Sequence, residues 1–70
     1  MVVNTEFFAC MYFANGGRLK YASENFEDAM ERARFWYNLF VLEWKGRFAD
    51  GAKIVSICVR KPCGTEIELM

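Results

Sequence analysis

The chain has no histidine and no excess of either charge. Without histidine it lacks the commonest general base and a frequent metal ligand, so histidine-activated nucleophiles and histidine-containing metal sites are excluded. Nine basic and nine acidic residues give a net charge of zero, which provides no overall attraction to nucleic acid or to anionic lipid. No apolar run reaches the roughly 18 residues that a membrane-spanning helix needs. These absences argue against catalysis and against membrane insertion.

Cysteine is scarce as well, with three residues and no C-x-x-C pair. Closed zinc sites use four ligands at short spacings, so we expect no metal, and nothing in the sequence indicates a cofactor. Glu6 lies within the apolar N-terminal stretch, and no basic segment precedes that stretch, which argues against a signal peptide. We therefore expect reduced thiols and a cytoplasmic protein. Cys63, in a turn, is the thiol expected to react most readily.

Apolar residues, in contrast, are abundant for so short a chain. Its 70 residues form a single domain, 1–70, and 54% of them are hydrophobic and 17% aromatic. A domain of this size buries only about 60% of its unfolded surface and often depends on disulfides, a metal or oligomerisation for stability. Because disulfides and a metal are both disfavoured, the surplus of apolar residues predicts an oligomer, most simply a dimer.

Residues 25–44 read as one helix. Asn25 can cap the amides of Glu27 or Asp28, and acids in the first turn suit the positive end of the helix dipole. An extended segment over 39–44 is the alternative to a continuous helix. At 100° per residue one broad apolar stripe forms the expected core face. It contains Phe26, Ala29, Met30, Ala33, Tyr37, Phe40, Val41 and Trp44.

A second apolar stripe lies on the opposite side of this helix. Phe35, Leu39 and Leu42 follow one another at i, i+4 and i+7, with Trp36 on the flank. Because a small domain has one core, we expect these four residues to form the contact between two copies. The alternative is coverage by the chain itself, through residues 46–52 or the N-terminus.

The first predicted hairpin joins strands 5–14 and 18–22 through Asn15-Gly16-Gly17. A two-residue turn places the even residues of the first strand beside the odd residues of the second. Phe8, Cys10, Tyr12 and Ala14 then form the core face with Leu19 and Tyr21. The opposite, open face is the predicted partner-binding surface. It consists of Phe7, Met11, Phe13, Arg18 and Lys20.

The second predicted hairpin joins strands 53–61 and 65–69. Direct pairing of Lys61 with Gly64 would set valine and isoleucine opposite glutamates. A three-residue loop with Gly64 in the left-handed region instead pairs Val59 with Ile67 and Arg60 with Glu66. We expect the second register. The resulting α+β fold is ββαββ, a four-stranded antiparallel sheet with one long helix packed on one face, and the strand order stays open.

Two short patterns suggest chemistry and are better explained by structure. Acids at positions 24, 27, 28 and 31 are typical of a helix N-terminus. The G-x-x-x-x-G spacing from Gly46 to Gly51 lacks the lysine and hydroxyl of a phosphate loop. Aromatic and basic residues on the open sheet face leave single-stranded nucleic-acid binding as an alternative function.

The succession of residues 17–23, 26–29, 51–57 and 62–65 resembles the compact ββαββ plan of short proteins from phages and mobile elements, including some anti-CRISPR proteins. That resemblance implies stoichiometric binding to a host protein, often by a dimer, and transfers no functional residue. The sequence therefore predicts a non-enzymatic binding protein, an inhibitor or adaptor, with nucleic-acid binding as the second hypothesis.

Overall fold

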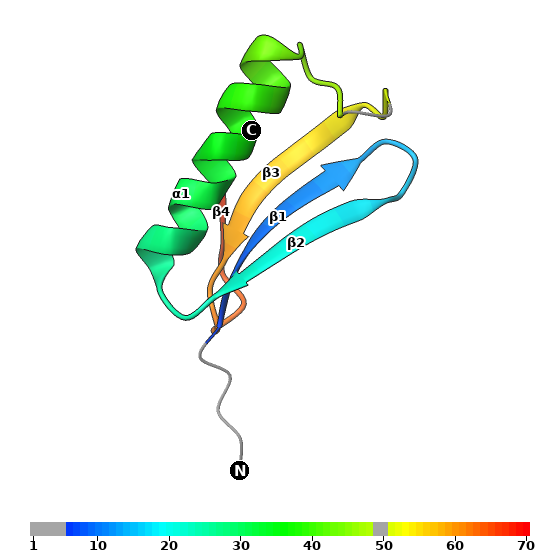
Figure 1. The fold of residues 1–70 in the computed structure, drawn as a ribbon. Coiled ribbons are helices and arrows are strands. Elements are labelled where there is room, and N and C mark those ends of the chain that lie inside the picture. Colours follow the sequence, from blue (N-terminus) through cyan, green and yellow to red (C-terminus); the bar gives the residue numbers. More distant parts are fainter. Residues whose placement is uncertain (1–5, 49–50) are drawn as a thin grey trace.

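The computed structural model describes residues 6–48 and 51–70 and has the predicted ββαββ order (Figure 1). The strands form one antiparallel sheet in the order β2-β1-β3-β4. The α+β prediction is therefore confirmed, while Thr5 and Asp50, which we placed in the first strand and in a turn, lie outside the described residues. The elements are β1 (Phe7–Phe13), β2 (Arg18–Ser23), helix α1 (Phe26–Trp36), π-helix η1 (Tyr37–Glu43), β3 (Ile54–Arg60) and β4 (Glu66–Glu68).

The helix begins where the sequence predicts. The side chain of Asn25 accepts a 2.7 Å hydrogen bond from the amide of Asp28. The helical chain then continues through η1 to Glu43, so the extended alternative for its last residues is wrong. It ends with the amide of Gly46 bonded to the carbonyl of Phe40 at 2.7 Å, after Lys45 enters the left-handed region at φ 57°.

The sheet-facing arc of the helix differs from the predicted stripe. Its buried residues are Ala29, Ala33, Trp36 and Phe40, so Trp36, which we assigned to the self-contact, is a core residue at 6% exposure. Trp44, which we assigned to the core, is 44% exposed and meets Phe40 edge-on. Trp36 follows Ala29 at i+7, so ordinary helical spacing places it on the buried arc. For Trp44 the cause is the π-helix, whose i→i+5 bonds widen the turn and change the direction of every later side chain.

The loop of the first hairpin is one residue longer than predicted. The amide of Phe13 bonds to the carbonyl of Gly17 at 2.9 Å, leaving a three-residue loop with Gly16 at φ 91°. Met11 therefore pairs with Leu19, and the odd residues of both strands share one face. A shift of one residue in the register changes which face of one strand joins which face of the other. Leu19 and Tyr21 therefore share a face with the odd-numbered residues of β1, and the two faces that we assigned to β1 are exchanged while those of β2 are kept.

The core consequently lies on the odd-numbered face of β1. Phe7, Met11 and Phe13, predicted on the open face, pack beneath the helix, and Met11 is fully buried. Only Arg18 and Lys20 of that predicted group stay on the open face, because they follow the even residues of β1. The buried core consists of Ala9, Met11, Ala29, Ala33, Trp36, Phe40, Ile54, Ile57 and Val59.

The second hairpin has the predicted register. Val59 pairs with Ile67 and Arg60 with Glu66, and Gly64 takes φ 95° in a three-residue loop. The amide of Leu69 bonds to the carbonyl of Ile57 at 2.9 Å, as the same register requires.

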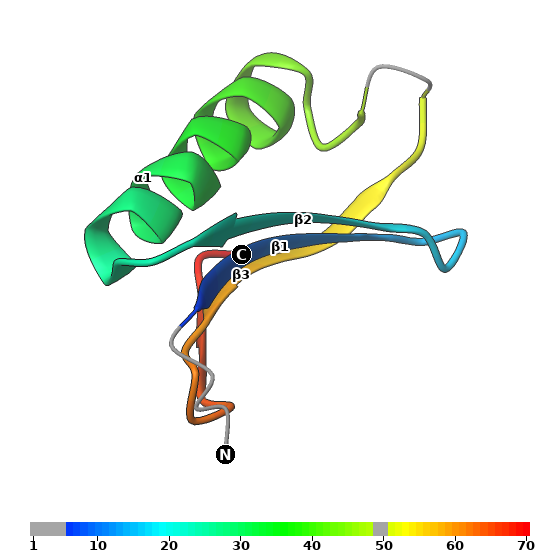
Figure 2. The ribbon, with the colours of Figure 1, turned by 60° about the horizontal axis from the view of Figure 1, so that its bottom comes forward.

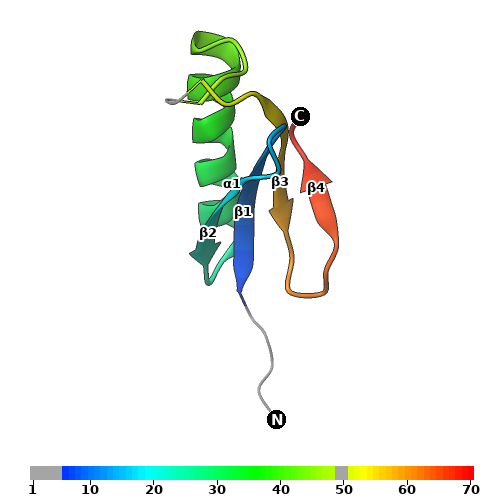
Figure 3. The same ribbon diagram turned by 90° about the vertical axis from the view of Figure 1, so that its right-hand side faces the viewer.

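The helix covers the sheet unevenly. Figure 2 shows it lying on one face of a curved sheet, and Figure 3 shows β4 at the far edge from the helix. The backbone of α1 approaches β1, β2 and β3, and η1 approaches β3, whereas neither approaches β4. One helix is narrower than four strands, so the outermost strand is only partly covered, with Ile67 half-buried.

Candidate protein-binding surfaces

The outer face of the helix carries an exposed apolar patch, here called the helix patch: Phe35, Leu39 and Leu42. Phe35 is 52% and Leu42 60% exposed, and Leu39 is half-buried. Phe35 and Leu39 border a shallow hollow with Asn38 and Glu43. Phe35 and Leu42 are thus exposed, whereas Leu39 also packs against the core and Trp36 belongs to it.

The loop after the helix packs on its inner side. The ring of Phe48 lies 4.8 Å from that of Phe40 and 5.3 Å from that of Phe13. It therefore closes the end of the core between helix and sheet. In the described part of the loop, residues 46–48 and 51–52, we find no coverage of Phe35 or Leu42, which stay exposed.

The open face of the sheet has basic side chains at one edge and acidic side chains at the other. β2 contributes Arg18 and Lys20, and β4 contributes Glu66 and Glu68, because these residues share a face with the even residues of β1 in the observed register. The two middle strands place Phe8, Cys10, Tyr12, Cys58 and Arg60 between them. This face is polar at its margins and aromatic at its centre.

Arg60 organises the centre of the open face. Its guanidinium donates to the Tyr12 hydroxyl at 3.0 Å and to a Glu66 oxygen at 3.0 Å and 3.1 Å. The hydrogen bond to Glu66 raises the pKa of Arg60, and burial raises the pKa of Tyr12. Lys20 lies over the Phe8 ring at 5.6 Å. These side chains therefore contact one another across the open face.

The cysteines provide no nucleophile at the sheet. Cys10 and Cys58 face each other across β1 and β3, 0% and 2% exposed, and burial raises the pKa of Cys58 to about 12. Cys63 is exposed in the second turn, where a hydrogen bond with Thr65 lowers the pKa of its thiol. Within residues 6–48 and 51–70, no three His, Cys, Asp or Glu side chains lie close enough together to hold a metal ion.

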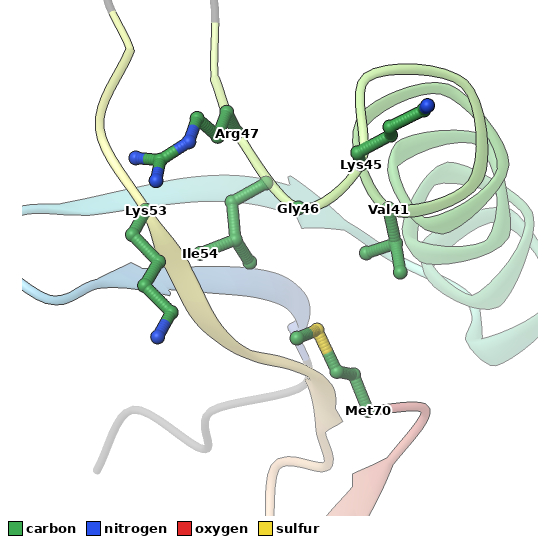
Figure 4. Close-up of a pocket in the computed structure, with 7 residues that line it drawn as sticks. All are labelled: Val41, Lys45, Gly46, Arg47, Lys53, Ile54 and Met70. Carbon is green, nitrogen blue, oxygen red and sulfur yellow. The ribbon is translucent and has the colours of Figure 1, made fainter.

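A groove lies between the helix and the residues that follow β4, Leu69 and Met70. One hollow is lined by Arg34, Tyr37, Asn38 and Leu69. Its neighbour, about 410 Å³ in volume, has Val41, Ile54 and Met70 at its centre. Figure 4 shows these three apolar side chains bordering the hollow. Three basic residues also line it, Lys45, Arg47 and Lys53, and their charged ends point in different directions.

Sequence reasoning missed this groove. The alternation of Ile67 and Leu69 with Glu66 and Glu68 did indicate an apolar face on the last strand. The strand order and the width of the helix decide that this apolar face is only partly covered, and neither can be read from the alternation.

No family model matches the chain, and no curated protein or solved structure matches it either. Among the described residues, no helix combines the length and apolar character needed to cross a bilayer.

Proposed function

We propose that this chain is a non-enzymatic protein-binding module that acts by stoichiometric contact. The observation that carries the proposal is the helix patch, in which Phe35 and Leu42 are each more than half exposed. Contiguous exposed apolar side chains usually mark interfaces, and each square ångström they bury contributes roughly 25 cal/mol. The resemblance to short phage proteins extends the proposal to an inhibitor or adaptor that acts in the cytoplasm of a host cell.

The proposed occupant of the helix patch is a second copy of the chain. Arg32 lies toward one end of the patch, 5.8 Å from the Phe35 ring, and Glu43 lies beside its other end. If two helices packed antiparallel about a two-fold axis, each Arg32 would approach Glu43 of the second copy. Apolar contact at the centre and opposite charges at the ends make the patch self-complementary.

Sedimentation equilibrium at tens of micromolar tests the self-contact. We expect the wild type to be a dimer and Leu42→Glu to be a monomer, because a buried carboxylate is costly. Val55→Glu is the matched control, since Val55 is 49% exposed on the sheet and lies away from the patch. A monomeric wild type, or equal dimerisation of Leu42→Glu, would overturn the self-contact.

Single-stranded nucleic-acid binding is the second candidate, and the observed register changes its residues. Phe8 and Tyr12, rather than Phe7 and Phe13, now share the open face with Arg18 and Lys20. Stacking on aromatic rings beside cations is the usual mode of such sheets. The acids on β4 weaken this candidate. A labelled oligothymidine that binds at low salt and is released by Lys20→Glu would support it, and no binding at low salt would eliminate it.

A further inference from the structure

We propose that β4 and the groove beside it bind an extended peptide of a different protein as a fifth strand. Apolar side chains of the peptide would enter the groove beneath the helix, and basic side chains would lie on the open face. The inference rests on the proposed protein-binding function and names a partner surface for it, but it does not depend on the helix patch.

The backbone of β4 offers a free edge to such a strand. Thr65, Ile67 and Leu69 are the residues bonded to β3, through the Lys61–Thr65 bond at 2.8 Å, the Val59–Ile67 pair and the Ile57–Leu69 bond at 2.9 Å. In an antiparallel ladder the intervening residues turn their amides and carbonyls to the other side. Glu66 and Glu68 therefore present main-chain groups at the outer edge, where no described strand pairs with β4.

The groove gives the peptide somewhere to place alternate side chains. Ile67 and Leu69 lie on the helix side of β4 and are half-buried, although the helix itself does not reach β4. Across from Leu69, the helix contributes Tyr37 to one hollow, and Val41 borders the next. Every second residue of an added strand points toward this space. A strand with apolar residues at those positions would therefore complete the cover that the single helix leaves unfinished.

Charge selects a foreign strand over a second copy. On the open face, Glu66 and Glu68 would lie beside the outward residues of the added strand. Two β4 strands paired together would bring these four carboxylates close, and like charges across a ladder are destabilising. The repulsion falls mainly on the two Glu68 side chains, because each Glu66 is ion-paired with Arg60 of its own chain. Lysine or arginine at the same positions is favoured instead. Acids on an edge strand protect against self-pairing, and the same acids attract a basic strand.

One end of the groove favours an acid. Lys45, Arg47 and Lys53 line the hollow that Met70 also borders. A carboxylate on the peptide near Met70 would be attracted by these three cations. The preferred ligand is therefore a strand of alternating apolar and basic residues with an acidic residue at the end that lies over Met70.

Titration with two synthetic peptides tests the inference. The probe is capped Val-Lys-Val-Lys-Val-Lys, and its control is capped Val-Val-Val-Lys-Lys-Lys, which has the same composition without the alternation. Fluorescence anisotropy of the labelled peptides should give at least tenfold tighter binding for the probe, because only alternation separates the two faces of a strand. Equal affinities for the two peptides, or no binding of the probe at millimolar protein, would overturn the inference.

Charge reversal locates the site. Glu68→Lys should weaken probe binding about five- to tenfold by removing one cross-strand attraction and adding a repulsion. Glu24→Lys makes the same change on an exposed residue before the helix and should leave binding unaltered. Equal losses in both variants would show a nonspecific charge effect and contradict the assignment to β4.

Backbone pairing has a readout of its own. In wild-type protein, saturating probe should slow amide hydrogen exchange at Glu66 and Glu68 at least tenfold, since these amides would donate to the peptide. Probe binding without that protection would overturn strand addition. A wild-type monomer that binds the probe would refute the self-contact alone, whereas a dimer that ignores the probe would refute the β4 site alone.

Discussion

The two hairpins close in the same way and are supported differently. In each, a three-residue loop ends in a left-handed glycine, Gly16 at φ 91° and Gly64 at φ 95°. The closing hydrogen bonds are nearly equal, 2.9 Å from Phe13 to Gly17 and 2.8 Å from Lys61 to Thr65. The first hairpin then lies beneath the helix, whereas the outer strand of the second extends beyond it.

This difference shows that the geometry of a turn sets the register of its two strands but does not determine how stably the outer strand is held. β1 is held by the core, and Met11 on it is fully buried. β4 is three residues long, and its side-chain anchor is the exposed ion pair between Arg60 and Glu66. Sub-global opening is expected where few apolar contacts hold an element. β4 should therefore be the more weakly held edge and the one available to a partner.

The largest expected effect separates the two hairpins by core burial. Met11→Ala should lower the free energy of unfolding by about 2–5 kcal/mol, because it leaves a cavity beneath the helix. Ile67→Ala, at a half-buried position of β4, should cost about 1 kcal/mol. Urea denaturation measures both. Equal losses would mean that β4 is as firmly held as β1.

The turns should respond alike. Gly16→Ala and Gly64→Ala each force a side chain into the left-handed region, at a cost of about 1–2 kcal/mol. A Cβ atom at either position meets nothing within 4 Å, so backbone strain is the only cause. Thermal unfolding of the two variants gives the comparison. A neutral Gly64→Ala beside a destabilising Gly16→Ala would show that the second turn relaxes without loss.

A smaller effect concerns the anchor of the second hairpin. Glu66→Gln should destabilise the protein by about 0.2–1 kcal/mol, since the side chains of Arg60 and Glu66 are 35% and 40% exposed and solvent screens their attraction. The loss should shrink in molar salt. Glu68→Gln is the control on the same strand. An equal loss in both variants, unaffected by salt, would assign no role to the ion pair.

The smallest effect lies at extreme pH and concerns the first hairpin. The Tyr21 hydroxyl donates to Asp28 at 2.8 Å. Hydrogen bonds from Ser23 and then Tyr21 lower the pKa of Asp28, so its contribution to stability is present above the ordinary value of 3.8 and is lost as pH falls through the folded value. The bond to Asp28 raises the pKa of Tyr21, so that contribution is present below 10.0 and lost as pH rises.

Tyr21→Phe should therefore flatten the stability profile at both ends of the pH range, while Glu66→Gln should leave the alkaline end unchanged. Chemical denaturation from pH 2 to pH 11 measures this. An unchanged profile in Tyr21→Phe would show that the bond to Asp28 contributes nothing in solution.

The hairpins also show how far sequence reasoning reaches. For the second, the alternation of apolar and acidic residues rejected the wrong register, because only one loop length pairs Val59 with Ile67. For the first, β1 is apolar on both faces, so the apolar residues of β2 can join either face and either register gives an acceptable core. Asn15-Gly16-Gly17 permits both loop lengths, and the two-residue turn we assumed is wrong.

Of the candidate surfaces, one could be predicted from the sequence and the other could not. The exposure of Phe35 and Leu42 followed from helical spacing, which is local. The groove beside β4 did not, because it depends on the strand order and on how many strands one helix covers.

The sequence by itself determined the ββαββ plan, the cap at Asn25 and the second register, since each depends on residues close together in the chain. Only the tertiary structure decided which face of β1 is buried, where the π-helix directs Trp44, and that β4 is only partly covered. Those outcomes depend on packing between elements distant in sequence, where several arrangements satisfy the same apolar pattern.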